Sequence, residues 1–367
     1  MQPFKPDSLP IKELDKAALF TAVGEANAAL ARYDGLLMGV VNPAVMLSPL
    51  TNQEAVLSSR IEGTQATVEE VLEHEAGQEY GEEKSQDIQE VLNYRKALML
   101  AKDDVQERPI RLALIRELHR ILMNSVRGEH KEPGQFRRDQ NWIGAPGCTI
   151  KQATFVPPSP LQLMDHLHAW ETYLGIDDID PIVQTAIVHA QFELLHPFKD
   201  GNGRIGRLLI PLFLYSKGRL TSPMFYLSAY LESNREEYYA RLRAISQNGD
   251  WTGWCAFFLR AVINQAQQNA TTLREIMALY EATKTQVRDI THSPHSPQLI
   301  DALFDRPIFT AANLAQRANV PKPTVHKLIN TLLDEGLLHR VRAASGRRPA
   351  ILAFAELLNT LERKQLV

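Results

Sequence analysis

The chain of 367 residues is long enough for two or three domains. Its 44% hydrophobic and 23% charged residues are typical of globular proteins, and a net charge of −3 gives no overall attraction to nucleic acid or anionic lipid. Two distant cysteines exclude a disulfide framework and a cysteine zinc site. No stretch reaches the roughly 18 apolar residues of a membrane span. We therefore expect a cytoplasmic protein without a membrane anchor.

Helical spacing of apolar residues predicts an all-α core. An N-terminal helical region is expected over 1–105 and a helical core over 106–290, and a Ser- and Pro-rich linker at 291–297 precedes a third domain at 297–367. The expected helices of the core are 110–123, 161–174, 181–195, 205–216 and 234–245, with one or two more over 251–290. Between 129 and 160 a Gly-Ala-Pro-Gly turn and short β-prone runs indicate either one hairpin or a plain surface loop.

The most informative stretch is His196-Pro-Phe-Lys-Asp-Gly-Asn-Gly-Arg-Ile-Gly-Arg207, between two apolar helices. Gly201 and Gly203 allow consecutive backbone N–H groups to converge on an anion, and the following helix adds the positive end of its dipole. Arg204 and Arg207 lie three residues apart, on one side of that helix, and suit a polyphosphate. The pattern predicts a phosphate-binding loop.

Two residues of the same stretch add chemistry to this loop. Asp200 offers the hard carboxylate oxygen that holds Mg²⁺ on nucleotide phosphates. His196 has an ordinary pKa near 6.5 and is suited to accept a proton from an attacking hydroxyl. A base, a metal ligand and a phosphate cradle therefore fall within twelve residues.

The stretch also fits other patterns, each with weaker support. The spacing Gly201, Gly203 and Gly206 also satisfies GxGxxG, but a helix rather than a strand precedes it and no acidic residue follows until Glu232. His189, Glu193 and His196 could present metal ligands on one helix face, although a lone histidine is more often a core residue. Phe198 is most simply a core anchor, and the Walker pattern GxxxxGK[ST] is absent.

The twelve residues resemble the signature HPFx[D/E]GNGRxxR of the Fic family of protein adenylyltransferases at every defined position, and 133–144 and 234–242 extend the resemblance. It implies a helical bundle in which His196 deprotonates a Ser, Thr or Tyr hydroxyl of a target protein, or of the chain itself, for attack on ATP. By the same resemblance Asp200 binds Mg²⁺. The implied ATP-binding residues are Gly201, Asn202, Gly203, Arg204, Ile205, Gly206, Arg207 and, as either an adenine contact or a packed aromatic, Tyr239.

Two further segments take roles from this resemblance. The family carries a hairpin flap that holds the target as an added strand, and Cys148–Val156, with Thr149, Ile150 and Lys151, corresponds to it. Upstream, Ser58-Ser-Arg-Ile-Glu-Gly63 matches the inhibitory pattern [S/T]xxxE[G/N], which implies that Glu62 pairs with Arg207 and blocks the productive pose of ATP. Alternatively, Gly63 ends one helix and Thr64 caps the next, and Glu62 is only a cap or a surface residue at the helix end.

The C-terminal region predicts a winged helix-turn-helix, with two short helices joined near Asn319 and wing strands at 337–342 and 349–354. From Pro297 onward 10 Lys and Arg face 6 Asp and Glu, a local balance near +4. Such a module docks DNA or protein. In the DNA interpretation the contacts are Thr324, His326, Lys327, Arg347 and Arg348.

The sequence as a whole therefore predicts an autoinhibited transferase of AMP from ATP, with a helical Fic-type bundle, a small flap and a winged helix. Removal of AMP from modified proteins, with Glu62 orienting a water, is the first alternative. A DNA-binding regulator that senses nucleotide is the second. Exposed helices also allow a homodimer.

Overall fold

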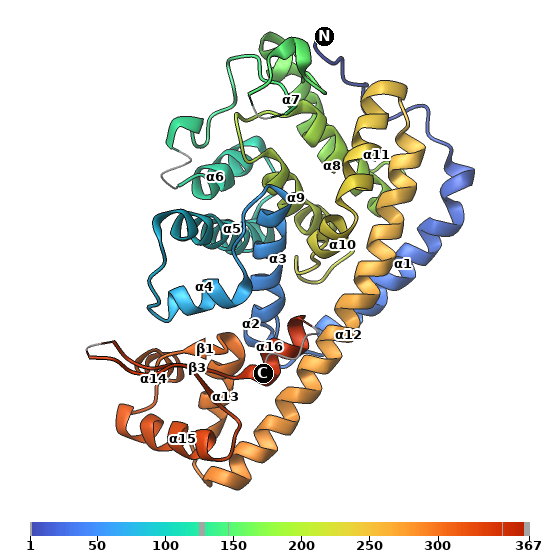
Figure 1. Ribbon diagram of the computed structural model, residues 1–367. Helices are drawn as coiled ribbons and strands as arrows, with labels where there is room; N and C mark the ends of the chain where they lie inside the picture. Colours follow the sequence, from blue (N-terminus) through green and yellow to red (C-terminus); the bar gives the residue numbers. More distant parts are fainter. Residues whose placement is uncertain (1, 125–128, 146, 347, 363–367) are drawn as a thin grey trace. The chain divides into compact units, whose positions relative to one another are not determined.

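The computed structural model describes residues 2–124, 129–145, 147–346 and 348–362. It is mostly helical with one small three-stranded sheet, which confirms the predicted fold class (Figure 1). The chain divides into two compact units, each built from three separated stretches. The first unit is Met1–Gly35, Leu57–Thr64 and Gln89–Gln267, and the second is Leu36–Val56, Gln65–Ile88 and Gln268–Val367. The domain limits drawn from the sequence divide the chain differently and stay a prediction.

The first unit is built from helices. Some are wholly inside it: α6(Leu112–Leu122), α7(Pro160–Leu174), α8(Pro181–Leu195), α9(Asn202–Ser216), α10(Ser228–Ser233) and α11(Arg235–Asn248), with the short 3-10 helices η1(Glu129–Lys131) and η2(Ile150–Gln152). Four others are shared with the second unit: α1(Lys16–Met38), α3(Ser48–Ile61), α5(Glu82–Glu107) and α12(Trp251–Thr291).

Helix α8 forms the centre of the first unit, because it is apolar on every side and almost every residue in it is buried. Asp180 caps its N-terminus by accepting from the backbone N–H of Ile182 at 2.8 Å, and Pro181 follows at the first helical position. Trp170 and Trp254 donate their indole N–H groups to carbonyls of α8 at 3.0 and 2.9 Å. Helix α9 packs against α8 (Figure 1), so the loop between them is anchored on two buried helices.

Several helix boundaries differ from the expected ones. Helix α9 begins at Asn202 rather than 205, because Gly201 adopts φ 75° and turns the chain directly into the helix. The segment from Trp251 forms a single helix of 41 residues. The next helix after Gly63 is α4(Val68–Glu75), and its N-cap is Thr67, not Thr64; Thr67 and Glu70 form a capping box.

The segment predicted as a hairpin reverses direction but forms almost no sheet. Ile143 pairs with Phe155 in a single antiparallel bridge, with 2.8 Å from the Ile143 N–H to the Phe155 carbonyl. Thr149, Ile150 and Lys151 lie at or in the 3-10 helix η2, whose start is closed by Thr149 and Gln152. Pro146, in the predicted turn, lies outside the described residues. The flap is therefore a loop closed by one bridge.

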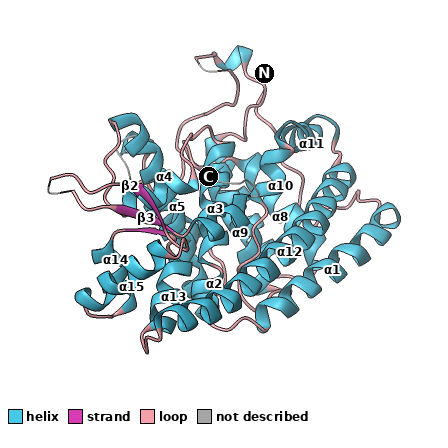
Figure 2. Cartoon of the chain, turned by 60° about the horizontal axis from the view of Figure 1, so that its bottom comes forward, coloured by secondary structure: helices cyan, strands magenta, loops and turns pink. Residues whose placement is uncertain are grey.

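The second unit contains the predicted winged helix (Figure 2). Its C-terminal elements are α13(Ser296–Asp305), β1(Ile308–Phe309), α14(Ala311–Ala318), α15(Lys322–Asp334), β2(His339–Arg342), β3(Ile351–Ala353) and α16(Ala355–Glu362), and α2(Pro43–Met46) and α4 join them. The strands form an antiparallel sheet in the order β1-β3-β2. Helix α14 ends at Asn319, which has φ 52° and makes the tight turn into α15.

Within the described residues, no helix has both the length and the apolar character needed to cross a bilayer.

Candidate active site

The loop between α8 and α9 begins and ends with left-handed backbone. His196 closes α8 with φ 47° and ψ 58°, while Gly201 opens α9 with φ 75°. A non-glycine residue in this conformation is uncommon and is held in place by its surroundings. The two turns fold residues 196–201 into a compact loop between the C-terminus of α8 and the N-terminus of α9.

Side-chain amides fix the inside of this loop. Asn202 accepts from the backbone N–H of Phe198 at 2.8 Å and donates to its carbonyl at 2.9 Å. Asn141 donates to the same carbonyl at 3.1 Å. The Phe198 ring stacks on His119 with centroids 3.7 Å apart, and His119 Nε2 reaches the Asp200 carbonyl at 3.0 Å. Asn202 therefore organises the loop backbone, and Phe198 is the buried anchor that the sequence suggested.

His196 is placed as an uncharged base. Its Nδ1 faces the Glu193 carbonyl at 3.4 Å, which leaves Nε2 free of any described partner. The pKa of His196 is lowered to about 4, mainly by burial and in smaller part by the charge of Arg137, while the Glu193 carbonyl and the charges of Glu62 and Asp200 oppose the shift. The imidazole is neutral at neutral pH and suited to accept a proton.

The N-terminus of α9 faces the same space as His196. The first N–H groups of a helix have no partner within the helix, and the dipole adds positive potential there, so this end favours an anion. Gly203 leaves room for close approach, because a Cβ at this position would overlap the Glu62 carboxylate and crowd Arg207. The geometry suits phosphate oxygens, and in this structure a carboxylate occupies that place.

Arg207 is held by the segment that carries Glu62. Its Nη2 lies 2.6 Å from Glu62 Oε1 and 2.8 Å from the Ser58 carbonyl, while its Nε donates to Ser58 Oγ at 2.9 Å. The Arg207 side chain is 1% exposed and that of Glu62 is 32% exposed. Burial alone would raise the pKa of Glu62, but the charge and hydrogen bond of Arg207 lower it below its ordinary value. Gly63 follows with φ 105° and turns the chain away.

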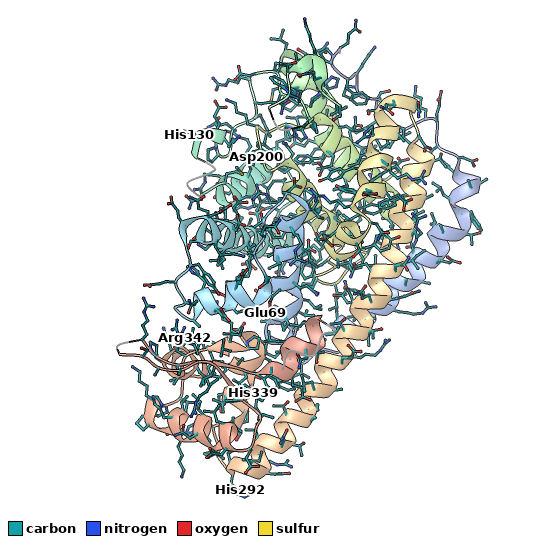
Figure 3. The ribbon with its side chains drawn as sticks, in the orientation of Figure 1. Glu69, His130, Asp200, His292, His339 and Arg342 are labelled. Atoms are coloured by element: carbon teal, nitrogen blue, oxygen red, sulfur yellow. The ribbon has the colours of Figure 1, made fainter. Side chains whose placement is uncertain are left out.

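Arg204 lies one helical turn before Arg207 on α9 and has different partners. It is buried and pairs with Glu90 of α5 at 3.1 Å. It also lies 3.8 Å from Asp200 Oδ1, and its Nε has no partner among the described residues. Asp200, labelled in Figure 3, lies in the loop between α8 and α9. Its side chain is 46% exposed, and its Oδ1 accepts from the Gly201 N–H at 2.6 Å. The two arginines are therefore engaged by different carboxylates, Glu90 and Glu62.

A cavity of 550 Å³ opens over this arrangement and is lined by Glu62, His196, Gly203 and Arg207. Residues near the flap and α11 complete its wall: Trp142, Ile143, Gly144, Thr154, Phe155, Glu193, Leu194, Arg235, Tyr238, Tyr239, Leu242, Arg243 and Ser246. Tyr239 is 36% exposed here, with the Arg235 guanidinium 5.9 Å from its ring. The flap contributes its bridged ends rather than Thr149, Ile150 and Lys151.

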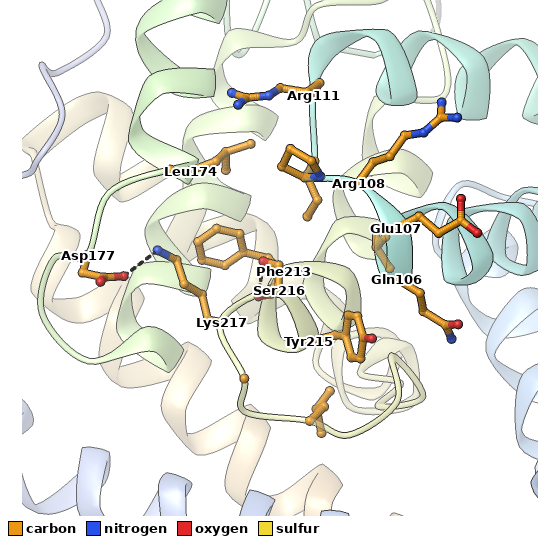
Figure 4. Close-up of a pocket in the computed structure, with 16 residues that line it drawn as sticks. Gln106, Glu107, Arg108, Arg111, Leu174, Asp177, Phe213, Tyr215, Ser216 and Lys217 are labelled. Atoms are coloured by element: carbon orange, nitrogen blue, oxygen red, sulfur yellow. Dashed lines mark hydrogen bonds and ion pairs between the residues drawn. The ribbon is translucent and has the colours of Figure 1, made fainter.

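A larger cavity of 780 Å³ lies around the opposite end of α9 (Figure 4). Its lining includes Phe213, Arg111 and Lys217, and Lys217 pairs with Asp177 at 3.0 Å. None of its lining residues belongs to the twelve-residue stretch. Size alone therefore does not identify the site in this molecule.

The metal arrangement considered for His189, Glu193 and His196 is not formed. His189 Nδ1 donates to the Gly206 carbonyl at 2.9 Å and its Nε2 accepts from the Tyr238 hydroxyl at 3.0 Å. No cluster of three His, Cys, Asp or Glu suited to a metal occurs in the described part of the chain. His189 and Gly206 join α8 to α9, and Ile205 is fully buried beside them.

The sequence assigns no role to two residues that shape the site, His119 and Arg137, and it marks Glu193 only as a candidate metal ligand. His119 supports Phe198 and Asp200, Arg137 binds the backbone around His196, and Glu193 lines the cavity. Arg137 belongs to the segment 133–144 that shares the family resemblance. The resemblance therefore marks the segment, but it does not predict which groups Arg137 contacts. Such roles depend on distant segments meeting, which spacing along the chain does not show.

The predicted DNA-contact residues lie in the second unit. Lys327 and His326 are exposed on α15, and Thr324 is partly buried. Arg348, in the wing, pairs with Glu79 at 2.6 Å, and Arg342 (labelled in Figure 3) bonds Gln78. Arg347 lies outside the described residues. DNA binding by this surface stays a prediction.

The fold and the loop together define a helical protein in which a neutral histidine faces a helix N-terminus. Two family models agree with this description: the Fic/DOC family N-terminal model matches residues 20–103 and the Fic/DOC family model matches 109–214. Together they cover just over half of the chain, which therefore belongs to the Fic/DOC family. The IclR helix-turn-helix domain model matches residues 298–342.

Curated relatives and solved structures are similar over different lengths. Protein adenylyltransferase fic-1 of Caenorhabditis elegans is 34% identical over 139 residues, 37% of this chain and 24% of that protein. Protein adenylyltransferase Fic of Drosophila erecta is 34% identical over 117 residues, 31% of this chain and 21% of that protein. The chain thus spans about a quarter of the length of these relatives.

Among solved structures, a Fic family protein from Desulfovibrio desulfuricans G20 aligns with a TM-score of 0.58 at 21% identity, over 96% of this chain and 98% of that one. Fic-1 of C. elegans aligns with a TM-score of 0.53 at 22% identity, over 73% of this chain and 74% of that one. These alignments show the fold.

Proposed function

We propose that this protein transfers AMP from ATP to a Ser, Thr or Tyr hydroxyl of a protein. The observation that carries the proposal is the single cavity in which a neutral His196, the N-terminus of α9 and Arg207 face one another. The names of the curated relatives, protein adenylyltransferases, support it.

The arrangement suits attack by a hydroxyl on a phosphate. His196 Nε2 takes the proton of the hydroxyl while the oxygen forms its bond to the α-phosphorus of ATP. The bond from that phosphorus to the bridging oxygen breaks, and pyrophosphate leaves with the electron pair. The N–H groups at the start of α9 and the Arg207 guanidinium stabilise the negative charge on the phosphates, so most of the catalytic effect comes from positioning and electrostatics.

Asp200 is the residue that would hold Mg²⁺. It is a half-exposed carboxylate beside the start of α9, and only one of its oxygens has a backbone donor within the described chain. Among the described residues it belongs to no cluster of three or more His, Cys, Asp or Glu that could hold a metal. One protein ligand fits an ion that completes its shell with phosphate oxygens and water. When bound, Mg²⁺ supplies charge neutralisation on the phosphates.

We also propose that Glu62 holds the enzyme inactive. Its carboxylate lies against Gly203 and pairs with Arg207, where phosphate oxygens of ATP would lie. Arg207 cannot donate all of its hydrogen bonds to a phosphate while its Nη2 and Nε groups donate to Glu62 and Ser58. Inhibition therefore amounts to an internal carboxylate competing with the nucleotide for one guanidinium.

Removal of AMP from a modified protein is the second candidate. Glu62 and His196 both line the cavity, so the carboxylate is placed where a water would meet a bound phosphodiester. In this reaction Glu62 is needed for activity, whereas in AMP transfer it opposes activity. The same variant therefore separates the two.

The test is intact-mass spectrometry of the wild-type protein, Glu62→Gly and the double variant Glu62→Gly with His196→Ala, each incubated with ATP and Mg²⁺. We expect the mass of one or more AMP groups on Glu62→Gly, little on the wild type and none on the double variant. Parallel incubation with GTP and UTP tests whether the protein uses ATP in preference to other nucleoside triphosphates. If Glu62→Gly binds ATP yet gains no mass and transfers no AMP to proteins of a cell extract, the transfer proposal is wrong.

A further inference from the structure

Arg137 donates hydrogen bonds to backbone carbonyls at the C-terminus of α8 and in the segment before α7. Arg137 Nε donates to the His196 carbonyl at 2.9 Å, and Nη2 donates to the carbonyls of Pro158 and Leu195 at 2.7 and 3.4 Å. Its own backbone N–H donates to the Pro197 carbonyl at 2.9 Å. Three consecutive carbonyls, from residue 195 to residue 197, are therefore held by a single residue.

The guanidinium of Arg137 has no counter-charge in the described part of the chain. The residue is 2% exposed, and all of its hydrogen-bond acceptors are backbone carbonyls, including Asp139 at 3.3 Å. Burial lowers the pKa of Arg137 to about 10, so it still carries its charge at neutral pH. A buried cation without a carboxylate is costly, and it is stabilised here by the negative end of the α8 dipole.

This position links Arg137 to the catalytic histidine in two ways. His196 adopts φ 47°, a conformation that needs external support, and Arg137 binds the carbonyl of that same residue. The positive charge also disfavours a second positive charge on the imidazole. We propose that Arg137 is the positioning residue of the proposed transfer reaction: its guanidinium fixes His196 in its left-handed turn and keeps the imidazole unprotonated.

Other charged groups also face His196 and must be considered in any test. Glu62, at the end of α3, and Asp200, in the loop, favour the protonated imidazole, while the Glu193 carbonyl on α8 accepts from Nδ1. Arg137 is the cation that opposes them. Glu62 is absent from both the Glu62→Gly parent and its Arg137 variants. Arg137 is therefore the only charged group near His196 that differs between them.

The experiment uses the full chain in the Glu62→Gly background and compares Arg137→Gln and Arg137→Lys. Arg317→Gln is the matched control, because Arg317 also donates to backbone carbonyls, those of Ala302 and Arg306, but lies in the winged-helix unit. Self-modification is followed at varied ATP to give kcat and KM across pH. The titration of His196 is followed by side-chain NMR, with its resonance assigned through His196→Ala.

For Arg137→Gln we expect a loss of kcat of about 10- to 100-fold with a much smaller change in KM for ATP, as displacement of a catalytic group produces. Its His196 resonance should titrate at higher pH, toward the ordinary value. Arg137→Lys should keep the low titration but lose kcat, because the single nitrogen of an ammonium cannot reproduce the planar fork by which Nε and Nη2 reach the carbonyls of His196, Pro158 and Leu195. Arg317→Gln should leave both unchanged.

The proposal is wrong if Arg137→Gln keeps the parent titration and kcat, or if its activity falls only in proportion to its folded fraction. If Arg137→Gln does not fold, Arg137→Lys carries the test through its kcat. The inference rests on the proposed function, but the NMR titration needs no turnover. An inactive Glu62→Gly parent would therefore refute AMP transfer, and the titration would still decide the role of Arg137 in setting the proton state of His196.

Discussion

Removing the Glu62 carboxylate, which we propose activates the enzyme, should also destabilise the protein. Glu62→Ala leaves the Arg207 guanidinium, whose side chain is 1% exposed, with only its two bonds to Ser58. Breaking a fully buried ion pair costs about 3–5 kcal/mol. Because the Glu62 side chain is 32% exposed, solvent screens part of this effect, and we expect about 1–3 kcal/mol.

The assay is urea unfolding followed by tryptophan fluorescence, since all four tryptophans lie in the first unit with the site. The pKa of Glu62 is lowered by folding, so its contribution is present above the ordinary carboxyl pKa and is lost as pH falls through the folded value. The difference between wild type and variant should therefore shrink in acid. Glu25→Ala, an exposed carboxylate on α1, is the control. Equal stability of Glu62→Ala and wild type at neutral pH would refute the reasoning.

Three further variants probe the same structure. Ser58→Ala removes the Oγ bond to Arg207 but keeps the carbonyl bond, so self-modification should rise less than in Glu62→Gly; a rise as large as that of Glu62→Gly contradicts the geometry. Gly203→Ala places a methyl group on the Glu62 carboxylate, so fluorescence-monitored unfolding should show a larger loss of stability with Glu62 present than in Glu62→Gly, and equal losses would count against the contact. Lys322→Glu with Lys327→Glu should weaken salt-sensitive binding of duplex DNA by the full chain, and absence of binding by the wild type at low salt would remove the DNA interpretation.

Much of the fold was predictable because its signals are local. The apolar runs of α8 and α9 and the turn at Asn319 follow from residues close together in sequence. The flap was harder, because β-prone residues formed only the Ile143–Phe155 bridge, and a capping pair at Thr149 and Gln152 turned the intervening chain into a 3-10 helix.

The sequence singles out candidate site residues but does not predict the partners that the structure gives them. Spacing predicts Arg204 and Arg207 on one side of a helix, but it does not predict that Arg204 pairs with Glu90 and Arg207 with Glu62. Each of these pairs joins segments more than a hundred residues apart. Such contacts are decided by which helices pack together, and no local pattern encodes them. Family resemblance was the only sequence signal for the Glu62 pair.

Glu193 is a carboxyl group whose surroundings disfavour its ionised form. Its Oε1 is buried without a partner in the described structure and lies against Gly206. Burial raises the pKa of Glu193 to about 8, which Arg207 opposes and Glu62 supports. The group is therefore mostly protonated at neutral pH in the folded protein, whereas in the unfolded chain it is ionised.

Folding at neutral pH must therefore take up a proton at Glu193, and this opposes stability. When the pKa of a group is higher in the folded than in the unfolded state, its protonated form favours folding, fully so below the unfolded pKa. This contribution to the free energy of unfolding is lost as pH rises through the folded pKa. Glu193→Gln resembles the protonated form and has no such dependence, so it should be more stable than the wild type at pH 7 by about 2–3 kcal/mol and nearly equal to it near pH 4. Tryptophan-monitored urea unfolding at the two pH values measures this. A Gln variant that is less stable at both would show that the carboxyl is ionised in the folded site, paired with Arg207 rather than protonated beside it.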